Sequence, residues 1–98
     1  MKILITGAQG QLGRELAEQS QLRGCRVQAP PEDELDITDL GKIDRIITLH
    51  QADIVINTAA YTQVDKAETE EAIAFEVNKT GCANLARVCA SNHIPLVH

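Results

Sequence analysis

The chain has 98 residues, 44% of them hydrophobic, and a formal net charge of −5. This length suits one small domain, and the hydrophobic share is sufficient for a packed core. The nine Lys and Arg residues form no run, so the acidic chain is a poor candidate for binding nucleic acid or an anionic membrane.

The cysteines and the apolar runs favour a cytoplasmic protein. The three cysteines are odd in number and show no C-x-x-C spacing, so neither a disulfide framework nor a zinc site is expected. The apolar run at residues 3–5 is too short for the core of a signal peptide. The run at residues 54–56 is too short to cross a bilayer, which needs about 20 residues.

Apolar runs of strand length alternate along the chain with segments of helical period. Residues 2–6 are short, continuous and aliphatic, which predicts a buried strand. Residues 11–23 follow with a helical pattern, and Gly24 is a C-terminal stop signal for that helix. Leu12 and Leu16 are expected to share one face of it.

A second strand is expected at residues 26–29. Pro30 and Pro31 end it, because proline cannot donate to a sheet ladder. Thr38 or Asp39 can cap the next helix. The apolar positions of that helix are Leu40, Ile43, Ile46 and Ile47.

A third strand is expected at residues 53–57 and a fourth at residues 94–98, with a helix at residues 70–91 between them. One face of that helix carries Phe75, Asn78, Cys82, Leu85 and Cys89. Buried strands joined by helical crossovers predict an α/β fold with a Rossmann-like, doubly wound parallel sheet. Since such a domain usually has about six strands, we expect residues 1–98 to be part of a longer NAD(P)-binding domain.

Gly7, Gly10 and Gly13 lie between the first strand and the first helix in the pattern G-x-x-G-x-x-G. One glycine would allow the turn, one the approach of a pyrophosphate to the backbone, and one the close packing of helix on strand. Free N–H groups at the start of the helix, including those of Gln11 and Leu12, would hold the phosphates. A plain glycine turn is the alternative.

The end of the second strand bears on the choice of cofactor. An acidic residue there would bond the adenosine 2′-hydroxyl of NAD, but this chain has Ala29, Pro30 and Pro31. Because no fixed carboxylate would repel a 2′-phosphate, we expect NADPH to be preferred over NADH. Arg14 or Arg26 could pair with that phosphate, and solvated surface positions are the alternative for both.

The glycine pattern, which follows Thr6, resembles that of the extended short-chain dehydrogenases. The resemblance implies that Asp36 accepts a hydrogen bond from the adenine amino group and that Ile37 flanks the ring. The residues alone leave a second interpretation open, in which Asp36 caps the next helix.

Residues 57–68, N-T-A-A-Y-T-Q-V-D-K-A-E, narrow the resemblance to the dTDP-4-dehydrorhamnose reductases. Ala59 and Ala60 would leave room for the ribose and pyrophosphate of the cofactor at the end of a parallel strand. Tyr61 and Thr62 would offer a ring and a hydroxyl near the nicotinamide. A polar surface loop is the alternative, but it does not explain the alanine pair.

The next helix is also similar to that family, through Val77-Asn78, Gly81 and Asn84-Leu85-Ala86. Asn78 lies among apolar positions, and a buried amide needs partners. The resemblance implies a water-mediated link from Asn78 to the active site. An internal bond that kinks the helix near Gly81 is an equal alternative.

The family reduces the C4 ketone of dTDP-4-dehydro-L-rhamnose with NAD(P)H, giving dTDP-L-rhamnose for bacterial surface polysaccharide. Some members bind Mg²⁺ through a Glu early in the first helix, near a dimer contact. Glu15 matches that position. A single carboxylate does not make a metal site, and a solvated helix-surface Glu is the alternative.

The catalytic Tyr-x-x-x-Lys pair of short-chain dehydrogenases does not occur in this chain. Tyr61 is the only tyrosine, and Asp65 stands four residues after it. We therefore expect the catalytic residues to lie beyond His98 and the chain alone to be inactive.

Other family assignments stay open at this point. One is a non-catalytic NADP-binding relative similar to the regulatory subunit of methionine adenosyltransferase. Another is a nucleotide-sugar epimerase or dehydratase of the same superfamily. In each case an uncovered sheet edge near residues 94–97 predicts a homodimer or poor solubility.

Overall fold

The computed structural model describes residues 1–7, 10–31, 34–58 and 71–97, with the side chains of residues 71–78 outside the description. All of the strands and helices expected from the sequence are present, in the expected order. Their bounds are β1 Lys2–Thr6, α1 Gln11–Leu22, β2 Arg26–Gln28, α2 Leu40–His50, β3 Ile54–Asn57, α4 Glu71–Ser91 and β4 Leu96–Val97.

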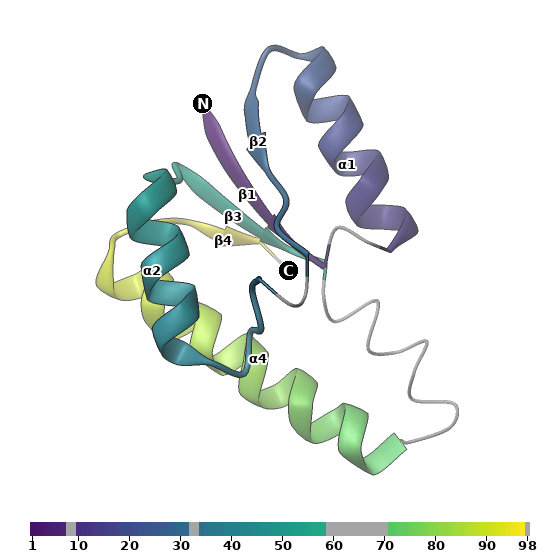
Figure 1. Ribbon diagram of the computed structural model, residues 1–98, viewed down its shortest axis with the longest axis vertical. Helices are drawn as coiled ribbons and strands as arrows, with labels where there is room; N and C mark the ends of the chain where they lie inside the picture. The colour runs from purple at the N-terminus through teal and green to yellow at the C-terminus, as the bar shows by residue number, and fades with distance from the viewer. Residues whose placement is uncertain (8–9, 32–33, 59–70, 98) are drawn as a thin grey trace.

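The described strands form one parallel sheet in the order β2-β1-β3-β4. β1 lies inside the sheet, with Ile3 paired to Val27 on one side and to Ile54 on the other. Helix α1 packs beside β1 and β2, and α2 and α4 lie together on the opposite face (Figure 1). The expected doubly wound α/β arrangement is therefore confirmed for the described residues.

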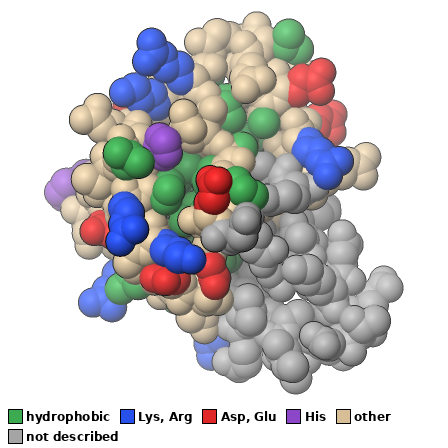
Figure 2. All heavy atoms as spheres, in the orientation of Figure 1, with side chains coloured by type: hydrophobic (Ala, Val, Ile, Leu, Met, Phe, Trp, Pro, Cys, Tyr) green, Lys and Arg blue, Asp and Glu red, His purple; other side chains and the backbone are tan. Residues whose placement is uncertain are grey.

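Charged side chains are spread over the surface of the described residues. On the face shown in Figure 2, acidic and basic side chains are interspersed and do not form a single basic area. None of the helices among the described residues is long and apolar enough to span a membrane.

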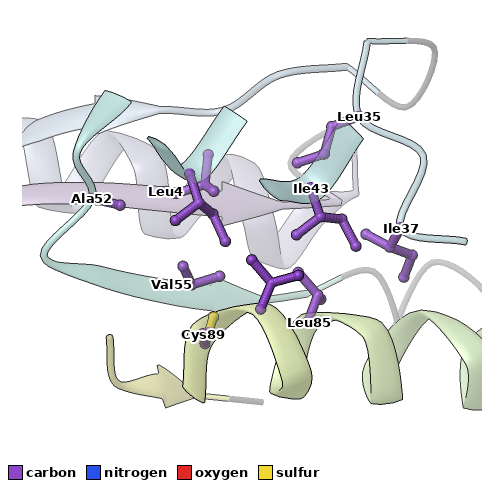
Figure 3. Close-up of a cluster of buried hydrophobic side chains, with 10 residues drawn as sticks. Leu4, Leu35, Ile37, Ile43, Ala52, Val55, Leu85 and Cys89 are labelled. Atoms are coloured by element: carbon purple, nitrogen blue, oxygen red, sulfur yellow. The ribbon is translucent and has the colours of Figure 1, made fainter. Parts of the chain in front are cut away.

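The core lies between the sheet and the helices α2 and α4. Leu4 and Val55 point from the sheet toward Ile43 of α2 and toward Leu85 and Cys89 of α4 (Figure 3). Alternation along a strand sends neighbouring side chains to opposite faces, so Ile3 and Ile5 are buried on the α1 side.

Helix α1 meets the sheet differently from the expectation. Leu12 and Leu16 were expected to share its apolar face, but Leu12 is 39% exposed and Leu16 is half-buried. The fully buried residue of α1 is Gly13. Because glycine has no side chain, the first turn of the helix can pack closely at Gly13, which is the role expected of the third glycine.

The helix boundaries follow the expected signals. Asp39 is the N-cap of α2, where its carboxylate accepts a hydrogen bond from the Lys42 amide at 3.2 Å. Gly24 follows α1 with φ +83°, a left-handed conformation that favours glycine. His93 adopts φ +56° in the exposed turn between α4 and β4.

Candidate functional site

The winding of the chain reverses between β1 and β3. From β1 the chain passes through α1 to β2 on one side, whereas from β3 it passes through α4 to β4 on the other. In open parallel sheets, ligands bind in the crevice at the carboxyl ends of the strands beside such a reversal. In this chain the carboxyl ends of β1 and β3 lie near the start of α1 (Figure 1).

The turn between β1 and α1 presents backbone amides to this crevice. Gly7 has φ +76°, and its carbonyl accepts a hydrogen bond from the Gly10 amide at 3.1 Å. Gly10 is the N-cap of α1, and its carbonyl accepts from the Arg14 amide at 3.0 Å. Among the described residues, no side-chain hydrogen bond caps this end of α1.

The helical hydrogen bonds of α1 thus start at Arg14, and the amides of Gln11, Leu12 and Gly13 have no carbonyl partner within the helix. These N–H groups and the positive end of the helix dipole favour an anion, above all a phosphate. The structure therefore brings together the predicted residues Gly7, Gly10, Gln11, Leu12 and Gly13 at one helix start.

A buried polar network joins the carboxyl ends of β1 and β3. The Thr6 hydroxyl donates to the Asn57 Oδ1 at 2.7 Å. The Thr6 carbonyl accepts from the Thr58 amide at 2.9 Å and from the Thr58 hydroxyl at 2.6 Å. All of these side chains are buried, so the network fixes the carboxyl ends of β1 and β3 relative to each other.

The network continues into α4, where the Asn57 Nδ2 donates to the Cys82 Sγ at 3.4 Å. Thr6 and Asn57 were not among the predicted site residues, although the sequence shows both of them. The available signal was a polar residue at the end of an aliphatic strand, which must find a partner if it is buried.

The predicted adenine segment, Asp36 and Ile37, lies between β2 and α2. The Asp36 Oδ1 accepts from the Thr38 hydroxyl at 2.6 Å and from the Thr38 amide at 2.9 Å. The hydrogen bond from the Thr38 side chain, followed by that from its amide, lowers the pKa of the exposed Asp36 carboxyl. Ile37 is buried in the core beneath it.

The alternative role of Asp36 as the cap of the next helix is wrong, because Asp39 caps α2. Asp36 instead closes a local turn with Thr38. A contact between Asp36 and adenine stays a prediction.

Several predicted residues have no description in the structure. Ala59, Ala60, Tyr61 and Thr62 lie outside the described residues, as does the side chain of Asn78. Glu15 is exposed on α1. The described part of the chain contains no cluster of three or more His, Cys, Asp or Glu side chains arranged to hold a metal ion.

The candidate phosphate ligands Arg14 and Arg26 are both exposed. Arg26 is the first residue of β2, so it lies at the amino end of that strand, opposite the crevice. A hollow of about 210 Å³ beside it is lined in part by Lys2, Gln28 and His50. This hollow is remote from the glycine turn and does not belong to the crevice.

Known proteins match this chain over nearly its whole length. The model of the family described as RmlD substrate binding domain matches residues 1–98. A dTDP-4-dehydrorhamnose reductase from Mycolicibacterium smegmatis is 46% identical over 97 residues, which cover 99% of this chain and 29% of that protein. One from Aggregatibacter actinomycetemcomitans is 41% identical, with 99% of this chain and 33% of that protein covered.

Solved structures agree with these sequence matches. A dTDP-4-dehydrorhamnose reductase from Bacillus anthracis, in complex with NADP, superposes with a TM-score of 0.86 at 33% identity. The match covers 99% of this chain and 35% of that structure. A Thermus thermophilus UDP-glucose 4-epimerase has a TM-score of 0.82 at 24% identity, which shows a shared fold. The chain therefore spans about a third of the length of these relatives.

Proposed function

Since the chain belongs to the RmlD substrate binding domain family, we propose that it forms the nicotinamide-dinucleotide-binding part of a dTDP-4-dehydrorhamnose reductase. The observation that carries this proposal is the start of α1. There the amides of residues 11–13 lack helical partners beside the reversal of the sheet. A cofactor diphosphate matches these donors in charge and in hydrogen-bonding capacity.

We propose NADPH as the preferred cofactor. Between Gln28, where β2 ends, and Pro31 no carboxylate occurs that could bond a ribose 2′-hydroxyl or repel a 2′-phosphate. The NADP complex of the Bacillus anthracis relative supports this choice. A higher affinity of the chain for NADH than for NADPH would contradict it.

The remaining contacts of the cofactor are assigned by family resemblance. Ala59 and Ala60 would lie against the ribose and pyrophosphate, and Tyr61 and Thr62 against the nicotinamide. Asn78 would reach the active site through water. A role for Glu15 in binding Mg²⁺ would need ligands from other residues, because one carboxylate does not hold the ion.

For the whole protein we propose reduction of the C4 ketone of dTDP-4-dehydro-L-rhamnose. The cofactor would supply the hydride, and the residues described here would bind and orient the cofactor. With Tyr61 as its only tyrosine and no Lys four residues on, the 98-residue chain should show background turnover. Measurable reduction of the nucleotide sugar by this chain would contradict that expectation.

A pair of glycine variants tests the binding site. Gly7 and Gly24 both have a left-handed backbone, with φ +76° and φ +83°. Gly7→Ala and Gly24→Ala should therefore each introduce strain of about 1–2 kcal/mol. An added Cβ at Gly24 meets nothing within 4 Å, so this variant controls for strain alone.

NADPH affinity is measured by titration calorimetry on the wild type and both variants. We expect Gly7→Ala to weaken binding by about tenfold or more, because the turn must move to relieve its strain. Gly24→Ala, at the far end of α1, should bind as the wild type does. Failure of the wild type to bind any nicotinamide dinucleotide would disprove the proposal.

A further inference from the structure

The segment that carries Asp36 has little backbone support of its own. Its described residues, 34–39, form no strand or helix, and their local hydrogen bonds run within turns. For example, the Leu35 amide donates to the Pro31 carbonyl at 2.9 Å. Leu35 and Ile37 are buried, while Asp36 is exposed between them. The direction in which the Asp36 carboxylate points therefore depends on how its buried neighbours are held.

Helix α4 holds Ile37 by its backbone. The Asn84 Nδ2 donates to the Ile37 carbonyl at 3.0 Å, between residues 47 positions apart in the chain. Asn84 is half-buried, so this hydrogen bond is partly shielded from water. The Ile37 carbonyl belongs to the Ile37–Thr38 peptide, whose N–H donates to the Asp36 Oδ1 at 2.9 Å. Holding this peptide therefore also holds a donor to the Asp36 carboxylate.

The same helix also holds the side chain of Ile37. Gly81 lies one turn before Asn84, and a Cβ built on it would overlap the Cγ1 and Cδ1 atoms of Ile37. Ile37 can pack against α4 at this point only because Gly81 has no side chain. Gly81 and Asn84 thus hold the side chain and the carbonyl of one residue.

We infer that Asn84 is a positioning residue for the adenine end of the cofactor. Through its hydrogen bond to the Ile37 carbonyl, it sets the place from which the Asp36 carboxylate meets the adenine amino group. This inference rests on the proposed function, since it presupposes a bound dinucleotide. By this inference, α4 contributes to recognition of the adenine through Asn84, although Asn84 need not contact the adenine itself.

The test compares NADPH with its hypoxanthine analogue, in which a carbonyl oxygen replaces the 6-amino group of adenine. A carboxylate can accept from the amino group but not from that oxygen. The wild type should therefore bind NADPH more tightly than the analogue. Asn84→Ala should weaken NADPH binding about fivefold to tenfold and bring the ratio of the two affinities toward one.

Asn92→Ala is the matched control. The Asn92 Nδ2 donates to the Val88 carbonyl at 2.8 Å, an equivalent bond just beyond the far end of the same helix. Its loss should leave both affinities unchanged. Asn84→Asp, which keeps the size of the side chain but removes the donor, should repeat the effect of Asn84→Ala and replaces that variant if it fails to fold.

A second arm tests whether Asn84 acts through Asp36. In an Asp36→Ala background, Asn84→Ala should no longer change the ratio of the NADPH and analogue affinities. If Asn84→Ala weakens both ligands equally, or if the wild type does not distinguish them, the inference is overturned while dinucleotide binding stands. If the wild type binds neither dinucleotide, the proposed function itself fails and the inference with it.

Discussion

Thr6 and Asn57 join the carboxyl ends of β1 and β3, where the ligand-binding edge of the sheet is expected. Both are buried, and the Thr6 hydroxyl donates to the Asn57 Oδ1 at 2.7 Å. Thr6→Val keeps the shape of the side chain and removes the donor. We expect the free energy of unfolding to fall by about 1–3 kcal/mol, because the buried Asn57 Oδ1 loses this donor.

Urea denaturation of the wild type, Thr6→Val and Thr6→Ser measures this effect. Serine retains the hydroxyl and loses only a methyl group, so Thr6→Ser should stay closer to the wild type than Thr6→Val does. The opposite order of the two variants would show that the methyl group, and not the hydrogen bond, supports this position.

Asp36 gives a prediction about pH. Hydrogen bonds from the Thr38 side chain and then from its amide hold the pKa of the Asp36 carboxyl below its ordinary value. Thr38→Ala removes the larger cause, so the pKa should rise toward that ordinary value, whereas Thr38→Ser should keep it low. NMR titration of the Asp36 side chain in the three proteins measures this directly.

The linked effect on stability has a definite sign. A carboxyl whose pKa is lower in the folded state stabilises the fold at pH values above its unfolded pKa. That stabilisation is lost as the pH falls through the lowered folded value. Thr38→Ala should therefore reduce the acid sensitivity that Asp36 contributes, and an unchanged acid dependence would count against the assigned cause.

Local patterns of residues could be predicted from the sequence, whereas contacts between residues far apart in the chain could not. Gly7, Gly10 and Gly13 could be assigned to the turn after β1 and the first turn of α1, because a local pattern marks the passage from a strand to a helix. The hydrogen bond between Thr6 and Asn57 joins residues 51 positions apart. No local pattern specifies such a pair, since it requires the register of β1 against β3.

Helix α4 shows how one glycine decides the packing of an element. A Cβ on Gly81 would overlap the side chain of buried Ile37. We expect Gly81→Ala to lower the free energy of unfolding by about 1–3 kcal/mol through overpacking. Gly41→Ala in α2 is the control, because its Cβ would lie at an ordinary 3.5 Å from the nearest atom.

A double-mutant cycle identifies the partner of Gly81. Ile37→Ala removes the atoms that the new Cβ would meet most closely, so Gly81→Ala should be less harmful in that background. The expected coupling is about 0.5–3 kcal/mol by chemical denaturation. If the changes in unfolding free energy were strictly additive, the cost of Gly81→Ala would not arise from overlap with Ile37.

Elements were easier to predict from the sequence than their contacts. The spacing of Leu40, Ile43 and Ile47 identifies α2 and its buried side, since a helical period is a property of neighbouring residues. Leu12 fits the same kind of pattern in α1 but is 39% exposed. Leu12 is exposed because α1 packs against the sheet at Gly13. A glycine has no side chain, so a pattern of apolar residues does not mark it as a packing position.

At the scale of the whole sheet, the described helices cover its two faces unequally. Helix α1 packs beside β1 and β2, while α2 and α4 cover the other face. On the α1 side, Ile54 and Ile56 are only half-buried and Val97 is 46% exposed. The parallel sheet was predictable from the alternation of strands and helices, but this imbalance depends on the order β2-β1-β3-β4.

An apolar face next to the sheet-edge strand β4 favours association with a second chain. We expect light scattering to give a weight-average mass that rises with concentration above the 10.7 kDa of the monomer. Val97→Lys should shift the mass toward that value, because a lysine disfavours both the apolar contact and strand pairing. Leu49→Lys is the control: it changes a 70% exposed leucine on α2 and should leave the measured mass unchanged. A monomeric wild type at all concentrations, or equal effects of the two lysines, would contradict association through β4.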